Sequence, residues 1–169
     1  CRQLVFERPI PEDLQSEIFR LRRRMEAEIA KEGETSFNIK TGRGGLVDVE
    51  FISQYLQLLH GKGRSSLQQP NTLQVLDGLE TEGLMPPEDA TILCDGYKFL
   101  RRLENKLRLL HDHSISELSA NRGYLRKLAR TLGYPERPRR PEESFLEDYR
   151  RITDKVREIF ERYLRPDAG

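Results

Sequence analysis

The sequence predicts an all-α protein, a helical bundle of about six helices. Apolar residues recur every three or four positions in several long segments, which is the spacing of one helix face. Glycine and proline fall between those segments, where helices end or begin. Strands have almost no support, because apolar and polar residues alternate only briefly, over residues 37–40. These three observations together favour helices packed on helices.

Length and composition fit one helical domain over residues 1–169. Within it we expect an N-terminal helix and lead-in (1–35), a signature loop with a central helix (36–60), and the rest of the bundle (61–169). The 29 lysines and arginines nearly balance the 28 acidic residues, which argues against disorder and against a general attraction to nucleic acid. No apolar run approaches the ~20 residues of a membrane span, and the two cysteines form no disulfide framework. The sequence therefore predicts a soluble, cytoplasmic protein.

The first helix is predicted to begin at Pro11 and to end near Gly33. Its apolar stripe consists of Leu14, Ile18, Leu21, Met25 and Ile29. The opposite face carries Arg22, Arg23, Arg24, Glu26 and Glu28, and we expect it to be solvated.

Five further helices are predicted, over residues 45–60, 72–82, 86–111, 120–132 and 145–163. Glycines 61, 83 and 133 mark three of their ends. The helix predicted over residues 86–111 has an apolar inner side, formed by Leu93, Tyr97, Leu100, Leu103, Leu107 and Leu110. The last helix has a heptad seam of Phe145, Tyr149, Ile152, Val156, Ile159 and Tyr163. Residues 135–141, with three prolines, are expected to form a stiff exposed loop.

The helix over residues 45–60 is apolar around most of its girth and is therefore expected to be central. Its polar stripe is Glu50, Ser53, Gln54, Gln57 and His60, and Val47, Phe51, Ile52, Tyr55, Leu58 and Leu59 cover the rest. Asp48 points into the apolar side, where a carboxylate needs a partner or a functional role. The alternative is that Asp48 only satisfies N–H groups in the first helical turn. Asp48 and Glu50 point apart on a helix, so they cannot by themselves form a metal site.

The segment before this helix carries the clearest sign of chemistry. Two cations and three glycines precede the helix start: Lys40, Gly42, Arg43, Gly44 and Gly45. Glycines let backbone N–H groups converge, and a helix start adds partial positive charge, so the segment is a candidate phosphate site. The alternative is an ordinary glycine-rich loop with solvated cations, since the pattern matches neither common nucleotide-binding fingerprint.

The other chemically interesting residues favour structural roles. Arg22–Arg24 and Arg137, Arg139 and Arg140 are basic clusters, but interleaved acids argue against nucleic-acid binding. His111 and His113 lack a third ligand for a metal, so no metal site is predicted. Cys94 is expected in the core. Glu104 can pair with Arg108, and Arg101 with Glu104, on one helix face.

Two stretches resemble a known family. Residues 40–54 resemble the K-x-G-x-G-G-[IL]-x-[DE]-[IV]-E-F-x-x-Q motif of bacterial glutamine synthetase adenylyltransferases (glutamate–ammonia ligase adenylyltransferase and adenylyl-removing enzymes). Residues 97–108 resemble that family's Y-x-F-L-R-x-x-E-[NH]-x-L-[RQ] helix. The likeness covers the chain from about residue 37 onward. It implies a helical domain that follows a nucleotidyltransferase domain, closer to the C-terminal, adenylylating copy of that pair.

The resemblance also implies residue roles and partners. Lys40, Gly42, Arg43, Gly44 and Gly45 become candidates for phosphate contacts, Asp48 and Glu50 candidate accessory residues, and Gln54, Tyr97, Arg101, Glu104 and Arg108 structural motif residues. The complete enzyme would use ATP and Mg²⁺ and would meet glutamine synthetase and the PII signal protein. The Gly-Ser turn and Asp-x-Asp pair of the catalytic domain are absent from this chain, so the chain alone is expected to be inactive. The alternative function is a docking or regulatory module for glutamine synthetase or PII.

Overall fold

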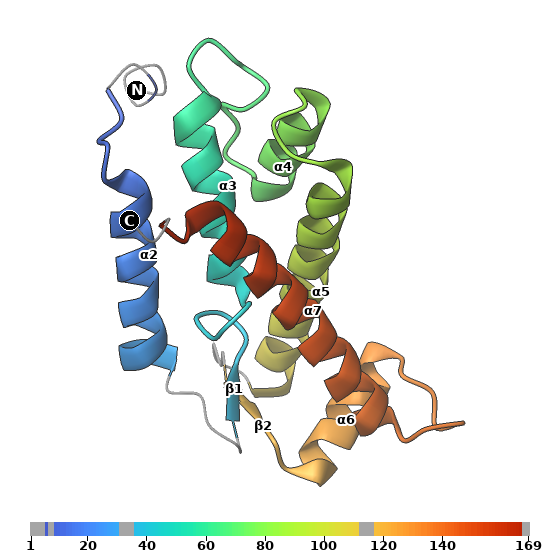
Figure 1. Cartoon of the computed structure of the whole chain (residues 1–169). Coiled ribbons are helices and arrows are strands. Elements are labelled where there is room, and N and C mark those ends of the chain that lie inside the picture. Colours follow the sequence, from blue (N-terminus) through green and yellow to red (C-terminus); the bar gives the residue numbers. More distant parts are fainter. Residues whose placement is uncertain (1–5, 7–8, 31–35, 112–116, 167–169) are drawn as a thin grey trace.

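A computed structural model describes residues 6, 9–30, 36–111 and 117–166 of the chain (Figure 1). Within these ranges the chain forms six α-helices, one π-helical turn and two short strands. The order is α2 (Leu14–Met25), the π-helical turn η1 (Glu26–Ala30), β1 (Ser36–Asn38), α3 (Leu46–His60), α4 (Thr72–Thr81), α5 (Pro87–His111), β2 (Glu117–Ser119), α6 (Arg122–Leu132) and α7 (Pro141–Leu164). The predicted all-α class is confirmed.

Helix α3 lies in the middle of the bundle and packs against α2, α4, α5 and α7. Figure 1 shows α7 running obliquely across α3 and α5, and α7 also contacts α6 and α2. The core between these helices is apolar and includes Val49, Ile52, Leu76, Leu93, Leu100, Phe145 and Phe160. None of the helices in the described ranges is long and apolar enough to span a bilayer.

Local sequence explains most helix ends. The Asn71 side chain accepts the N–H of Leu73 (2.9 Å) at the start of α4, and Asn121 accepts the N–H of Tyr124 (3.1 Å) at the start of α6. Pro141 occupies the first turn of α7, where its missing N–H costs nothing. Gly133 ends α6 with φ +92°, a left-handed conformation that glycine adopts without strain.

The first helix differs from its predicted bounds. Its regular part begins at Leu14, because Pro11 lies in a preceding turn whose carbonyl accepts the Leu14 N–H (3.2 Å). At Met25 the helix widens into the π-helical turn η1. The predicted end at Gly33 lies outside the described residues, as does the side chain of Ile29.

The two strands were not predicted. Strand β1 pairs antiparallel with β2, and Phe37 stands opposite Leu118. Each strand has only three residues, which is too short for a clear alternation, and the partners are far apart in the sequence. The pairing holds the segment that leads into α3 against the end of the bundle.

Two predicted faces are also wrong. Leu21 of the α2 stripe is 44% exposed, while Arg22, predicted to be solvated, is completely buried. Leu59, placed on the apolar side of α3, is 42% exposed, and Ser53 of its polar stripe is buried. Periodicity identifies a helix but not how far its neighbours extend over it, and it cannot detect a polar partner that draws a charged residue inward.

Candidate functional site

The glycine segment between β1 and α3 is folded on itself by backbone hydrogen bonds. The N–H of Gly42 donates to the Asn38 carbonyl (2.8 Å), and the N–H of Gly45 donates to the Gly42 carbonyl (3.0 Å). The first two N–H groups of α3 donate to the carbonyls of Ile39 (3.1 Å) and Lys40 (3.0 Å). The loop therefore supplies acceptors for the helix start that follows it.

Glycine is required at position 44 by backbone conformation and by space. Gly44 has φ +70°, and a Cβ there would lie 1.9 Å from the carbonyl oxygen of Thr153 on α7. A Cβ at Gly45 would lie 2.8 Å from the carbonyl oxygens of both Ile39 and Lys40. These glycines thus allow the loop to touch α7 and to close on itself.

The hydrogen bonds within the loop limit which of its groups can contact a phosphate. The N–H groups of Gly42, Gly44 and Gly45 already donate to acceptors of the chain itself. The side chains of Lys40 and Arg43 are exposed, and Arg43 forms an ion pair with Asp154 of α7. The folded loop therefore offers a phosphate these two exposed cationic side chains rather than the N–H groups of its three glycines, and phosphate binding stays a prediction.

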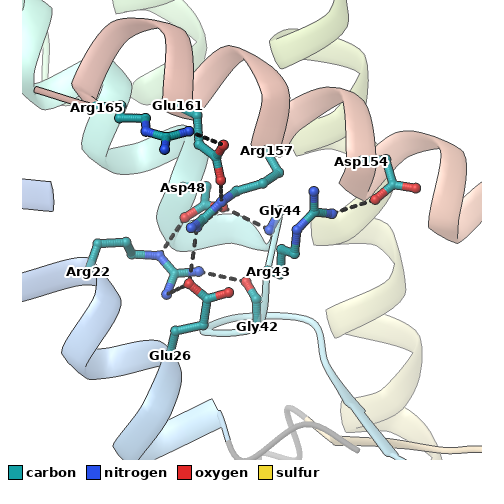
Figure 2. A network of polar contacts seen from close by, with 10 residues as sticks. All are labelled: Arg22, Glu26, Gly42, Arg43, Gly44, Asp48, Asp154, Arg157, Glu161 and Arg165. Atoms are coloured by element: carbon teal, nitrogen blue, oxygen red, sulfur yellow. Dashed lines mark hydrogen bonds and ion pairs between the residues drawn. The ribbon is translucent and has the colours of Figure 1, made fainter. Parts of the chain in front are cut away.

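Asp48 lies at the centre of a buried cluster beneath the loop (Figure 2). Its carboxylate is fully buried and accepts from the Nε of Arg22 and from the N–H of Gly44 (2.8 Å). Arg157 Nη1 of α7 lies 3.5 Å from the same carboxylate. Arg22 Nη2 also donates to the Gly42 carbonyl (2.7 Å), so one arginine holds both the carboxylate and the loop. Asp48 thus has the partner that its position required, and the N–H that it accepts belongs to Gly44, ahead of the helix.

Further carboxylates surround the two arginines (Figure 2). Arg157 Nη1 lies 3.1 Å from Glu26 of η1, and Arg157 Nε donates to Glu161 (2.8 Å) one turn along α7. Arg165 lies 3.9 Å from Glu161. Three arginines therefore face three carboxylates, and the cluster joins α2, the signature loop and α7 without excess charge.

Burial and pairing act against each other on Asp48. Burial raises the pKa of Asp48, while the charges of Arg22 and Arg157 and the Gly44 N–H act to lower it. Burial also lowers the pKa of Arg157, but its hydrogen bond to Glu161 and the charges of Asp48 and Glu26 outweigh that effect, and its pKa is raised. Each charge in the cluster therefore depends on its partners to offset the cost of leaving water.

Glu50 belongs to a second cluster on the other side of α3. Its carboxylate accepts from Arg101 Nη2 (3.0 Å) and from the Tyr97 hydroxyl (3.2 Å), both on α5. Arg101 Nη1 donates to Glu104 (2.8 Å), and Arg108 lies 4.0 Å from Glu104. The predicted pairs along α5 are confirmed, and the two sequence motifs meet at Glu50. Asp48 and Glu50 do point apart, as predicted.

The remaining predicted residues fall into simpler places. Gln54 is exposed, and Cys94 is half-buried against the core. Arg137, Arg139 and Arg140 are exposed in the loop before α7. The side chain of His111 and all of His113 lie outside the described residues.

The described residues do not fit magnesium. They bring no three histidine, cysteine or acidic side chains together as metal ligands, and both oxygens of Asp48 already have partners.

Sequence reasoning missed most of the Asp48 cluster. The sequence pattern places Arg22 and Glu26 on a solvated face, and it does not mark Arg157 or Glu161. The available signal was that a buried carboxylate needs a cation. With 29 lysines and arginines in the chain, that requirement does not identify which one meets it.

Comparison with known proteins finds a matching family model and several enzymes with similar sequences. The model of a family described as GlnD PII-uridylyltransferase matches residues 18–164. A bifunctional glutamine synthetase adenylyltransferase/adenylyl-removing enzyme of Streptomyces coelicolor is 34% identical over 167 residues, covering 96% of this chain and 16% of that enzyme. Enzymes of the same name from Stenotrophomonas maltophilia and Hahella chejuensis are 39% identical over 110 and 111 residues, covering 65% and 66% of this chain.

The chain spans only a small part of these relatives, 12% of the Stenotrophomonas enzyme and 11% of the Hahella enzyme. The family model, in contrast, covers most of the chain, from within α2 to the last residue of α7, and includes every residue of the two clusters around α3 except Arg165. The chain therefore belongs to the GlnD PII-uridylyltransferase family.

Proposed function

We propose that this chain is the helical domain of an enzyme that adenylylates and de-adenylylates glutamine synthetase, and that it supports the active site of a preceding nucleotidyltransferase domain. The names of the relatives support this activity. ATP and Mg²⁺ are assigned to the preceding domain, because this chain lacks the Gly-Ser turn and the Asp-x-Asp pair. The chain alone is then inactive. Its likeness to the adenylylating copy favours a place at the C-terminal end of the enzyme.

The observation that carries the proposal is the clamp on the signature loop. The Asp48 carboxylate accepts from the Gly44 N–H, and Arg22 donates to the Gly42 carbonyl, so the loop is tied at two points between α2 and α7. Asp48 is completely buried and is therefore a positioning residue rather than a catalytic one. Lys40 lies on the exposed side of the same loop, where it can reach the phosphates of a nucleotide held by the neighbouring domain.

The buried ion cluster around Asp48 is better suited to holding the loop in position than to stabilising the fold. Replacing such clusters with apolar side chains is often neutral or stabilising, so the cluster is no efficient source of folding energy. In some proteins a buried charged cluster selects one packing over others, since a shift leaves a charge unpaired. We infer that the cluster fixes how α2, the loop and α7 meet, and with it the position of Lys40.

The test compares two exposed lysines in the complete enzyme, with both of its domains. Lys40→Ala removes the loop cation, and Lys62→Ala removes an exposed lysine beyond the far end of α3 as a matched control. A charged contact to phosphate contributes about 1.5–3 kcal/mol, so Lys40→Ala is expected to lower AMP transfer to glutamine synthetase about tenfold or more. The expected effect includes a raised KM for ATP, with thermal stability unchanged. Equal activity of the two variants would refute the role of the loop.

The second candidate is a docking module for glutamine synthetase or PII. The favouring observation is that the exposed Lys98 and Arg102 and the partly exposed Lys106 on α5 form no ion pair among the described residues. Purified glutamine synthetase and PII are each passed over the immobilised chain. Retention of either protein at moderate ionic strength supports docking, and retention of neither leaves only the supporting role.

A further inference from the structure

A groove on α5 concentrates positive charge in a chain that is otherwise balanced. It has a volume of about 540 Å³ and runs beside the first turn of α4. Three cationic side chains line it, Lys98, Arg102 and Lys106, together with the largely apolar side chains of Leu73, Tyr97 and Leu109. No aspartate or glutamate of the described chain lines this α5 groove, although the net charge of the sequence is only +1.

The charges in the groove are not neutralised within the described part of the chain. Lys98, Arg102 and Lys106 form no ion pair there, and the Arg102 side chain donates to the neutral carbonyl of Leu132 (2.8 Å). Arg101, in contrast, is already engaged by Glu50 and Glu104. The three remaining cations are therefore available to carboxylates from outside the chain.

The spacing of the groove residues matches the turns of a helix. Positions 98, 102, 106 and 109 follow one another every three or four residues along one face of α5. The ladder spans about 16 Å, since eleven residues rise about 1.5 Å each. At its end Leu109 is 76% exposed, and Leu73 of α4 gives the groove a second apolar side.

From this juxtaposition we infer that the α5 groove docks an acidic amphipathic helix of a partner protein. Such a helix would present carboxylates one turn apart to the three cations and an apolar side chain to Leu73 and Leu109. A protein helix fits better than a nucleic acid, because the groove is lined by leucines and the balanced charge of the chain offers no extended basic field for a phosphate backbone. The inference does not depend on the proposed catalytic support.

The test measures binding of a labelled helical peptide to the 169-residue chain by fluorescence anisotropy. The peptide carries glutamates at successive turns of one face and a leucine one turn beyond them. A control peptide of the same composition distributes the glutamates around all faces. We expect the designed peptide to bind in the micromolar range and the control peptide about tenfold more weakly.

Two charge-matched variants locate the site. Lys98→Glu combined with Lys106→Glu is expected to weaken peptide binding about tenfold or more. Lys127→Glu combined with Lys155→Glu makes the same change in net charge on other exposed helix faces and should leave binding within about twofold. Lys98→Glu alone and Leu109→Ser, both at exposed positions, repeat the test if the first double variant loses its helical circular dichroism.

Three results would overturn the inference. Equal losses in the two double variants would show that only net charge matters. Equal binding of the two peptides would show that the groove does not recognise glutamates arranged on one face of a helix. Tighter binding of a short single-stranded oligonucleotide at Lys98 and Lys106 would assign the groove to nucleic acid instead.

Discussion

Asp48 and Glu50 lie two residues apart on α3, and each pairs with arginine, but their surroundings differ. Asp48 and Arg22 are both completely buried, whereas the side chains of Glu50 and Arg101 are 25% and 43% exposed. Water can replace a lost partner at Glu50, but it cannot reach Asp48. The stability of the fold therefore depends more strongly on the buried pair of Asp48 and Arg22 than on the partly exposed pair of Glu50 and Arg101.

The largest expected effect separates the two carboxylates directly. Asp48→Ala removes the fully buried carboxylate that Arg22 and Arg157 share and leaves them only the partly exposed Glu26 in common (3.8 and 3.1 Å), so it should cost about 3–5 kcal/mol of unfolding free energy. Glu50→Ala leaves a half-exposed Arg101 that still has Glu104, and should cost about 1 kcal/mol or less. Urea denaturation of both variants measures the difference. Similar losses in the two would show that burial does not distinguish the clusters.

The loop side of the buried cluster gives the next effect. Gly44→Ala forces a left-handed conformation and a clash with Thr153, and should destabilise the chain by at least about 2 kcal/mol. Gly83→Ala is the matched control, because Gly83 has φ +69° and nothing within 4 Å of the added Cβ. It should cost only the conformational part, about 1–2 kcal/mol. If the control lost as much as Gly44→Ala, the close approach of the loop to α7 would not matter.

The smallest expected effect is the pH dependence of stability that comes from a third carboxylate, Glu142 of α7. Two hydrogen bonds from Arg126 (3.0 and 2.7 Å) lower the pKa of Glu142 to about 2, from an ordinary value of 4.5. Because the folded pKa lies below the unfolded one, this pair stabilises the fold above about pH 4.5 and ceases to do so as pH falls toward about 2.

Melting temperatures between pH 6 and pH 2 check this assignment for Glu142. The Glu142→Gln variant should lose less stability than the parent chain across the acid range. Glu143→Gln on the same turn, whose nearest cation Arg122 lies 3.7 Å away, serves as the control. An unchanged acid response in Glu142→Gln would exclude its pairing with Arg126 as a source of pH dependence.

The sequence allowed prediction of the helices and their ends but not of the polar clusters. Helix periods are local, so α3, α4, α5 and α6 lie within two residues of their predicted bounds. Helix α7 begins four residues before the predicted start, because Pro141, assigned to the exposed loop, is its first residue. The need of Asp48 for a partner was also visible locally. The partner is Arg22, which directly follows Leu21 of the predicted apolar stripe on a helix distant in the sequence. No local pattern marks Arg22 as that partner.

The same limit applies to the glycines and the strands. Glycines before a helix predict a phosphate site, whereas in the fold their N–H groups donate to acceptors of the chain itself and Gly44 makes room for Thr153. The pairing of β1 with β2 joins segments about eighty residues apart, and each strand is too short to show a period. Contacts between distant segments are fixed by the assembled bundle rather than by local spacing.

The central claim is that Asp48 acts through Arg22 to hold the signature loop. A double-mutant cycle tests it most directly, with Arg22→Met and Asp48→Asn in urea denaturation, beside the cycle of Arg101→Met and Glu50→Gln. We expect a coupling energy of about 2 kcal/mol or more for the buried pair and about 0.5 kcal/mol or less for the half-exposed pair. Equal coupling energies in the two cycles, or additive losses at Arg22 and Asp48, would contradict the account.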